Sequence, residues 1–267
     1  MNNQIAYVVT GNLAVIVWIL AIIGTITVSK TILKIVYRVL STKTLQKSRK
    51  RVEKDDIEYY NSTYYLSTKN TLNDVIRDKG LEGEYNIFEK LQKFENNGAR
   101  FLFNCYLPKE HNETTEIDVI LLTHDGIFVF ESKNYNGWIY GSEEQDLWTQ
   151  TLRAGNKIHK THFYNPVRQN KTHIKYLKKI IGDNLPIYSV IVFSNECILK
   201  DVEITDPLTK VIYLNHAITT ILNLSSKTPN SISQEKLISI YDQLYPYTQV
   251  SNEIKLKHIE NINKMRV

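Results

Sequence analysis

Hydrophobic and polar positions divide the chain into an uncharged amino-terminal stretch and a longer region of short alternating segments. No charged residue occurs from Ile5 to Val28. At about 1.5 Å of rise per residue, a helix of this length crosses the roughly 30 Å hydrocarbon core of a bilayer. We therefore expect one transmembrane helix over residues 5–28. A cleaved signal peptide is disfavoured because residues 1–4 carry no positive charge.

Basic residues follow this stretch, and none precedes it. They are Lys30, Lys34, Arg38, Lys43, Lys47, Arg49, Lys50 and Arg51. Because positively charged flanks stay on the cytoplasmic side, we expect a single-pass protein of the cell membrane with its carboxy-terminal domain in the cytoplasm. Anionic lipid headgroups are the favoured partner of these residues, and nucleic acid is the alternative. Residues 29–79 are expected to form this basic juxtamembrane segment and a tether with some helix.

The periodicity after residue 80 predicts a helix followed by several strands. Apolar residues recur at helical spacing from Ile87 to Phe94, and Gly98 follows as a stop signal. Short segments with strand-like alternation come next, at residues 100–107, 116–123, 126–133, 138–141 and 147–152.

A second helix has clear start and stop signals. Asn165 is a suitable cap, Pro166 occupies the first turn and Gly182 follows the end. An apolar strand at 187–193 comes after it. Helix, strands, helix and strand in this order predict an α/β fold with a mixed β-sheet flanked by helices. We expect this domain over residues 80–225, with a carboxy-terminal helix and a peripheral tail over residues 226–267.

Composition narrows the class of protein without deciding its function. A hydrophobic content of 42%, with 10 glycines and 6 prolines, excludes a disordered or fibrous chain. Cys105 and Cys197 lie in apolar segments without zinc-binding spacing, which favours buried, reduced thiols. The net charge of +5 is weak evidence for a polyanionic partner, because much of the basic excess lies in the juxtamembrane segment.

The segment EIDVILLTHDGIFVFESKNY, residues 116–135, predicts a β-hairpin. Asp125-Gly126 is a dipeptide favoured in two-residue type I′ turns. With these two residues in the loop, His124 lies opposite Ile127.

The same register places charged side chains together at the far end of the hairpin. Asp118 falls opposite Lys133, and Glu131 is diagonal to Asp118 at roughly 7–8 Å. All three share the face of the inward apolar residues because side chains alternate along a strand. A divalent-metal site would explain the cluster, with Asp118, Glu131 and the carbonyl of Ser132 as oxygen ligands and Lys133 beside the attacking water. A salt-bridged triad at a sheet edge is the structural alternative.

These residues carry a resemblance to a known family. Asp118 and, after twelve residues, Glu131-Ser132-Lys133 resemble the PD-(D/E)xK nuclease signature, with Ile117 where the family name has proline. The surrounding sequence is similar to the nuclease-related domain (NERD) family over roughly residues 80–193. The shared features are Gly83-Glu84, Glu116-Ile117-Asp118, Asp125-Gly126-Ile127-Phe128, Glu131-Ser132-Lys133-Asn134, Gly137, Trp148, Asn165-Pro166 and Gln169.

The resemblance implies a restriction-endonuclease-like fold and Mg²⁺-dependent hydrolysis of nucleic-acid phosphodiesters, with Mn²⁺ as a second metal. It implies Asp118 and Glu131 as metal ligands and Lys133 as the helper of the catalytic base. Glu84 would be a further acid, reaching the site from the first helix. Its place on the apolar stripe of that helix argues against a purely helix-capping role.

Gln169 lies on the apolar stripe of the second helix, so it should face the sheet. It could bind a phosphate or tie the helix to a sheet edge, and both readings stay open. His173, one turn further, is read as a packing histidine, and the nearby His159 and His162 are read as solvated residues of a basic loop. The remaining basic residues around this helix could track a phosphate backbone or form a solvated face: Lys157, Lys160, Arg168, Lys171 and Lys175.

Two functions from different classes follow. The leading hypothesis is a membrane-tethered, Mg²⁺-dependent nuclease that acts on nucleic acid, with DNA preferred over RNA. The alternative is an idle nuclease fold that binds nucleic acid or protein at the membrane. Retention of both acids and the lysine favours the enzyme. A purely structural anchor protein would make the charge cluster a coincidence.

Overall fold

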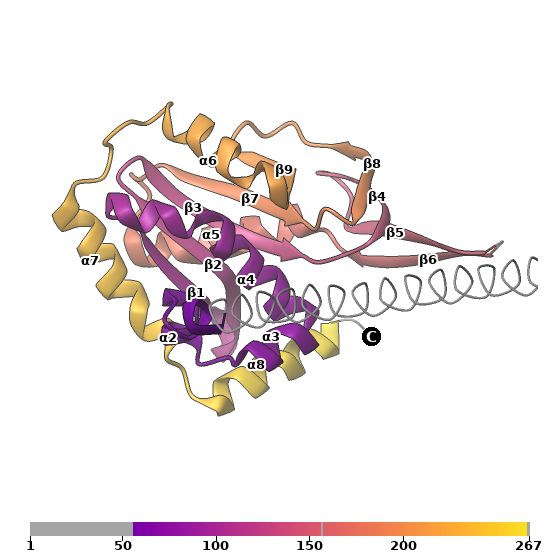
Figure 1. Ribbon diagram of the computed structural model, residues 1–267, viewed down its shortest axis with the longest axis horizontal. Helices are drawn as coiled ribbons and strands as arrows, with labels where there is room; N and C mark the ends of the chain where they lie inside the picture. The colour runs from indigo at the N-terminus through magenta and orange to yellow at the C-terminus, as the bar shows by residue number, and fades with distance from the viewer. Residues whose placement is uncertain (1–55, 156, 266–267) are drawn as a thin grey trace, which may run out of the picture. The chain divides into compact units, whose positions relative to one another are not determined.

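The computed structural model describes residues 56–155 and 157–265. A compact unit begins at Tyr59 and contains every element considered below (Figure 1). The predicted membrane span, Ile5–Val28, lies outside the described residues. Within the described ranges, no helix is both long and apolar enough to cross a bilayer.

A five-stranded mixed sheet forms the centre of this unit. Its strands lie in the order β1-β2-β3-β7-β9. Strand β2 is antiparallel to both of its neighbours, β1 and β3, whereas β3, β7 and β9 run parallel. Their bounds are β1 Arg100–Pro108, β2 Thr114–Thr123, β3 Gly126–Lys133, β7 Ile187–Phe193 and β9 Thr209–Tyr213.

Helices cover both faces of this sheet, as the alternating sequence pattern predicts. On one face α4 (Lys79–Leu91) and α6 (Ala217–Ser225) enclose a core with Val119, Leu121, Phe128 and Phe130. On the other face α5 (Pro166–Ile181) and α7 (Gln234–Leu244) enclose a core with Ile120, Leu122, Ile127 and Val129. Successive residues of β2 and β3 thus enter different cores, which is why both strands are almost continuously apolar.

The structure contains a second sheet, whereas the sequence predicts a single one. Its order is β6-β5-β4-β8, with β4 Gly137–Ser142, β5 Leu147–Ala154, β6 Lys157–Tyr164 and β8 Cys197–Glu203. Trp148 of β5 is fully buried and stacks on Phe193 of β7, with ring centroids 6.1 Å apart. The interpretation of His159 and His162 as loop residues is wrong, because both belong to β6.

Residues 29–55 of the expected juxtamembrane segment and tether lie outside the described residues, and residues 56–79 contribute to the core. The latter form α2 (Thr63–Thr68) and α3 (Leu72–Arg77). Tyr59 and Tyr64 are 2% and 0% exposed, and Tyr64 packs edge-on against Phe103 of β1. The predicted domain boundary at residue 80 therefore falls inside a compact unit that extends back to Tyr59.

The carboxy-terminal region also packs more closely than a peripheral tail would. Helix α8 (Asn252–Met265) places His258, 6% exposed, against Thr114 of β2, with Nδ1 and Oγ1 3.0 Å apart. Four 3₁₀ segments complete the described elements, at Gln92–Asn97, Glu110–Asn112, Leu214–His216 and Tyr245–Thr248.

The β2–β3 hairpin differs from its prediction by two residues in register, one in each strand. Thr123 pairs with Gly126, so the loop residues are His124 and Asp125. Distant segments fix this loop: Ile232 donates to the carbonyl of His124 and Asn230 donates to the Asp125 carboxylate. A shift of one residue in each strand preserves the faces, so the predicted alternation is confirmed.

We expect Tyr64→Ala to lower the free energy of unfolding by about 3–5 kcal/mol, because it leaves a cavity in an aromatic cluster. Tyr60→Ala is the matched control, since Tyr60 is 39% exposed, and it should cost about 1 kcal/mol or less. Urea unfolding followed by circular dichroism measures both. Equal effects of the two substitutions would contradict the assignment of Tyr64 to the core.

Candidate functional site

Asp118 lies where the pairing of β2 with β1 is interrupted and the pairing of β2 with β3 ends. The β1–β2 ladder omits the pair Asn104 and Asp118, and the β2–β3 ladder ends at Val119 and Phe130. Asn104 has φ of +48°, in the left-handed region that asparagine tolerates. The Asp118 carboxylate replaces the missing ladder contact, because the backbone N–H of Ser132 donates to its Oδ2 at 2.8 Å.

Continued by one residue past its last pair, Val119 with Phe130, the observed register brings Asp118 level with Glu131 rather than with Lys133. Glu131 and Lys133 still share a face, as predicted, since the Lys133 ammonium donates to Glu131 Oε1 at 2.6 Å. The ammonium also lies 3.3 Å from Gln169 Oε1 on α5. Lys133 is therefore held between a carboxylate of its own strand and an amide of the covering helix.

His173 orients the other side of the Glu131 carboxylate. Its Nε2 lies 3.1 Å from Glu131 Oε2, and its Nδ1 lies 2.6 Å from Thr115 Oγ1. An ionised carboxylate only accepts hydrogen bonds, so Nε2 is the donor to Glu131, and Nδ1 shares a hydrogen bond with the threonine hydroxyl. The sequence interpretation of His173 as a packing residue is incomplete, because the side chain is buried and also bonds to the site.

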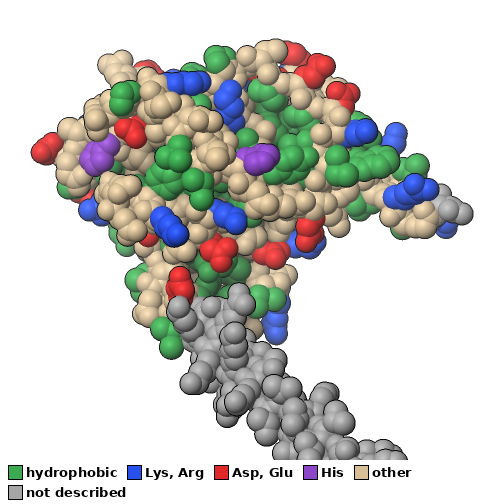
Figure 2. All heavy atoms as spheres, turned by 45° about the horizontal axis from the view of Figure 1, so that its top comes forward, with side chains coloured by type: hydrophobic (Ala, Val, Ile, Leu, Met, Phe, Trp, Pro, Cys, Tyr) green, Lys and Arg blue, Asp and Glu red, His purple; other side chains and the backbone are tan. Residues whose placement is uncertain are grey.

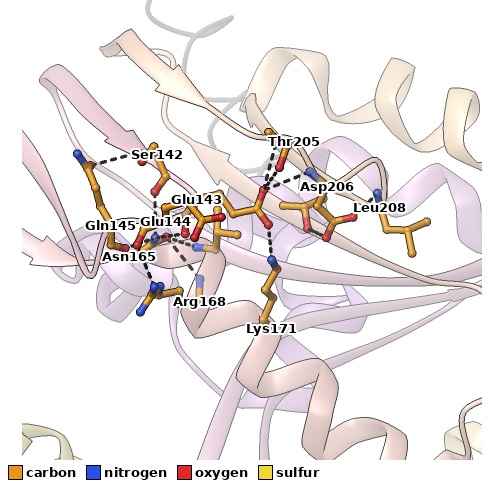
Figure 3. Close-up of polar contacts among 12 residues, drawn as sticks. Ser142, Glu143, Glu144, Gln145, Asn165, Arg168, Lys171, Thr205, Asp206 and Leu208 are labelled. Carbon is orange, nitrogen blue, oxygen red and sulfur yellow. Dashed lines mark hydrogen bonds and ion pairs between the residues drawn. The ribbon is translucent and has the colours of Figure 1, made fainter.

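The start of α5 is fixed to the β4–β5 turn, and this fixes Gln169. Asn165 caps the helix by accepting from the N–H of Val167, and its amide donates to the carbonyls of Ser142, Glu143 and Gln145 (Figure 3). The Asn165-Pro166 motif thus has a structural role. Gln169, one turn further, reaches Lys133, so the structure favours a side chain that faces the site.

Helix α4 brings Glu84 to the opposite side of the strand ends. Glu84 is 8% exposed and accepts from the Asn104 amide at 3.0 Å. Gly83 permits the close approach of α4, since a Cβ at this position would lie 2.3 Å from Ser132 Oγ. The pocket beside it is lined by Asn86, Ser132 and Lys133, among others.

The electrostatics of the cluster are dominated by burial. Burial, then Glu131 and Glu84, raise the pKa of Asp118 well above its usual value. Burial also raises the pKa of Glu84 to about 8. Burial opposes the ionised form of Glu131, but Lys133 and His173 outweigh it and lower the pKa of Glu131. For Lys133, burial is outweighed by Glu131 and Asp118, so its pKa is raised and the amine is protonated at neutral pH.

The oxygen ligands at this site suit a hard divalent cation, both in the type of atom and in charge. Burial, and then the neighbouring Glu131 and Glu84, raise the pKa of Asp118, and a bound cation would favour its ionised form. In the part of the chain that the structure describes, no three His, Cys, Asp or Glu side chains are arranged as a ready-made metal centre. Mg²⁺ commonly uses one or two carboxylates and water, which Asp118, Glu131 and the Ser132 carbonyl could satisfy.

Several site features could not be inferred from the sequence motifs. Asn104 and Thr115 act through partners that the fold supplies, and neither lies in the recognised pattern. Asn170 is fully buried and donates to the Val129 carbonyl at 2.8 Å, fixing α5 to β3. Arg168 forms an ion pair with Asp146, and Lys171 forms one with Glu143 (Figure 3). Both pairs connect the amino-terminal half of α5 to the β4–β5 turn.

Comparison with known proteins identifies the family of the chain. The family described as "Nuclease-related domain" matches residues 79–194, which contain all six predicted site residues. The chain belongs to this nuclease-related domain family. An uncharacterized Bacillus anthracis protein, pXO1-01, is 32% identical over 197 residues, covering 72% of this chain and 90% of the relative. No solved structure matches the chain significantly.

Glu84 should make the stability of this nuclease-related domain depend on pH. Its pKa rises from 4.5 to about 8 on folding, so the folded state binds the proton more tightly. The resulting stabilisation is full below pH 4.5 and is lost as the pH rises to about 8. Glu84→Gln stays neutral, so its free energy of unfolding should exceed that of the wild type by a growing margin over this interval, reaching a few kcal/mol.

Urea unfolding between pH 5 and 9 measures this margin. Glu89→Gln, an exposed position on the same helix, is the control and should follow the wild type. A margin for Glu84→Gln that does not change with pH would contradict the buried, protonated carboxyl.

Proposed function

We propose that this protein is a membrane-anchored, Mg²⁺-dependent nuclease of the PD-(D/E)xK superfamily that hydrolyses phosphodiester bonds, with DNA preferred over RNA. The observation that carries the proposal is the Lys133 ammonium, held by Glu131 and Gln169 beside Asp118. Phosphodiester hydrolysis needs oxygen ligands for a metal and a cation near the reacting phosphate, and this arrangement supplies both kinds of group.

The protonation of Lys133 narrows its role. Since its pKa is raised, the ammonium donates hydrogen bonds and stabilises negative charge that develops on the phosphate, and it is poorly suited to remove a proton. Gln169 holds the ammonium in place and offers its own amide to a phosphate oxygen. Mg²⁺, held by Asp118, Glu131 and the Ser132 carbonyl, would polarise the phosphate and lower the pKa of an attacking water.

Glu84 and His173 position the groups around them. Glu84 approaches from α4 and holds the Asn104 amide, on the strand next to Asp118. His173 fixes the orientation of Glu131 from α5, and a fixed carboxylate loses less entropy when it binds a cation.

The alternative is a binding module of the same fold. Both oxygens of Glu131 already have partners, Lys133 and His173. A cluster with a purely structural role would show the same pairing, so this observation is also consistent with the alternative. The presence of Asp118 and Glu84 argues for the enzyme, because an ion pair of Glu131 with Lys133 gains no stability from two further buried acids.

The membrane part of the proposal rests on sequence. The uncharged span Ile5–Val28, followed by basic residues, would place the nuclease-related domain in the cytoplasm. Lys30 and the basic residues after it would then contact anionic lipid headgroups.

Substitutions should separate the roles of the site residues. Lys133→Ala should reduce cleavage by about 10²–10³-fold and leave Mg²⁺ binding nearly unchanged, because the ammonium is not a metal ligand. Asp118→Ala should lose both cleavage and Mg²⁺ binding, and Glu131→Gln should weaken both. Cleavage of labelled DNA and calorimetric Mg²⁺ titration measure these effects, with Lys175→Ala on the exposed side of α5 as the control. Ca²⁺ should bind and support little turnover.

The enzyme proposal would give way to the binding module on the following result. The wild type cleaves no nucleic acid with any divalent metal, and the wild type and the Lys133→Ala variant bind nucleic acid equally well.

The topology has its own test. Protease added to intact cells should leave a carboxy-terminal epitope and the domain from Tyr59 onward undigested, whereas detergent-permeabilised cells should lose both. Digestion of the domain in intact cells would reverse the proposed orientation.

A further inference from the structure

Strands β5 and β6 form a two-stranded ribbon that extends from the second sheet (Figure 1). The two strands pair without interruption from Leu147 and Tyr164 to Ala154 and Lys157. Every described residue of β6 is exposed except Phe163, which is half-buried near the base. We call residues 147–164 the basic ribbon.

The basic ribbon carries positive charge without compensating acids. Between Leu147 and Tyr164 the sequence contains Arg153, Lys157 and Lys160, with two histidines and no aspartate or glutamate. Among the described residues, these three cations form no ion pair. Figure 2 shows basic and hydrophobic side chains gathered on the projecting lobe that contains the ribbon.

The ribbon also exposes apolar groups beside these cations. Ile158 is 62% exposed and pairs directly with Arg153, so the two side chains share a face. Lys160 lies on the same face, two residues further along the strand. A face that combines cations with an exposed aliphatic side chain is suited to phosphates and to the methyl group of thymine.

The base of the ribbon is fixed to the candidate site. Gln150 donates to the backbone carbonyl of Asn136 at 2.9 Å, and Asn136 lies three residues after Lys133. Trp148 is buried against Phe193, whose register partner is Lys133. A nucleic acid held by the ribbon is therefore held at a defined place relative to the site.

We propose that the basic ribbon binds duplex DNA by entering its major groove. The groove of B-form DNA is about 12 Å wide and admits a two-stranded β-ribbon. Eight residues per strand span about 26 Å, enough to follow the groove. A-form RNA has a narrow major groove that side chains do not enter. The proposal rests on nucleic acid being the substrate, and it assigns duplex DNA as the substrate class.

The test compares two triple variants of the full-length protein in detergent. The ribbon variant carries Arg153→Gln, Lys157→Gln and Lys160→Gln. The control carries Lys227→Gln, Lys236→Gln and Lys257→Gln, which are exposed positions beside or on α6, α7 and α8. Both lose three positive charges, so general electrostatics change equally. Fluorescence anisotropy with labelled duplex DNA in EDTA measures affinity without cleavage.

The ribbon variant should bind duplex DNA at least about tenfold more weakly than the control at 0.1 M salt, and its salt slope should fall by about 2–3. The wild type should prefer duplex DNA to duplex RNA, and the ribbon variant should lose most of that preference. Equal binding by the two variants, or tighter wild-type binding of duplex RNA or single strands, would overturn the proposal.

These outcomes are distinct from failure of the nuclease proposal. Ribbon-dependent DNA binding without metal-dependent cleavage would refute the enzyme and leave the ribbon assignment intact. Cleavage of duplex DNA with the same KM in the ribbon variant and the control would refute the ribbon and leave the enzyme intact.

Discussion

Burial of unbalanced charge is the constraint on which the candidate site depends. Glu131 and Asp118 lie beside Lys133, Glu84 approaches from α4, and burial makes each ionised carboxylate costly unless a partner compensates it. Glu131 obtains two partners, and its pKa falls, whereas Asp118 and Glu84 are left with raised pKa values. A cation bound beside these two acids would favour their ionised forms.

The surrounding fold serves to keep these groups in place. Asp118 is held at an interruption of two ladders by the N–H of Ser132, and Glu84 is held by the amide of Asn104. Helix α5 contributes from the other face because Asn165 fixes its start and Asn170 fixes its middle. Groups from both helical layers thus meet at one end of the central sheet without any of them lying on a long loop.

The two-residue alternation of strands and the 3.6-residue repeat of helices were enough to predict much of this arrangement. Alternation along β2 and β3 predicts the shared face of Glu131 and Lys133, and the stripe on α5 predicts that Gln169 faces the sheet. The register was wrong because Asn230 and Ile232, more than 100 residues away, fix the loop. The exposed strand β6 and the core tyrosines of the supposed tether were missed because neither has the apolar periodicity of a half-buried element. His173, Thr115 and Asn104 gain their roles only from tertiary contacts.

The packing of Trp148 has a spectroscopic consequence. Of the three tryptophans, Trp148 is fully buried on the Phe193 ring at the base of the basic ribbon, whereas Trp138 is 40% exposed. An indole in an apolar site emits at shorter wavelength than a hydrated one, and its emission responds to small changes in the rings around it. The protein therefore contains an intrinsic fluorophore at the junction between the ribbon and the strand that pairs with Lys133. Events at either place can be followed by its emission without any added label.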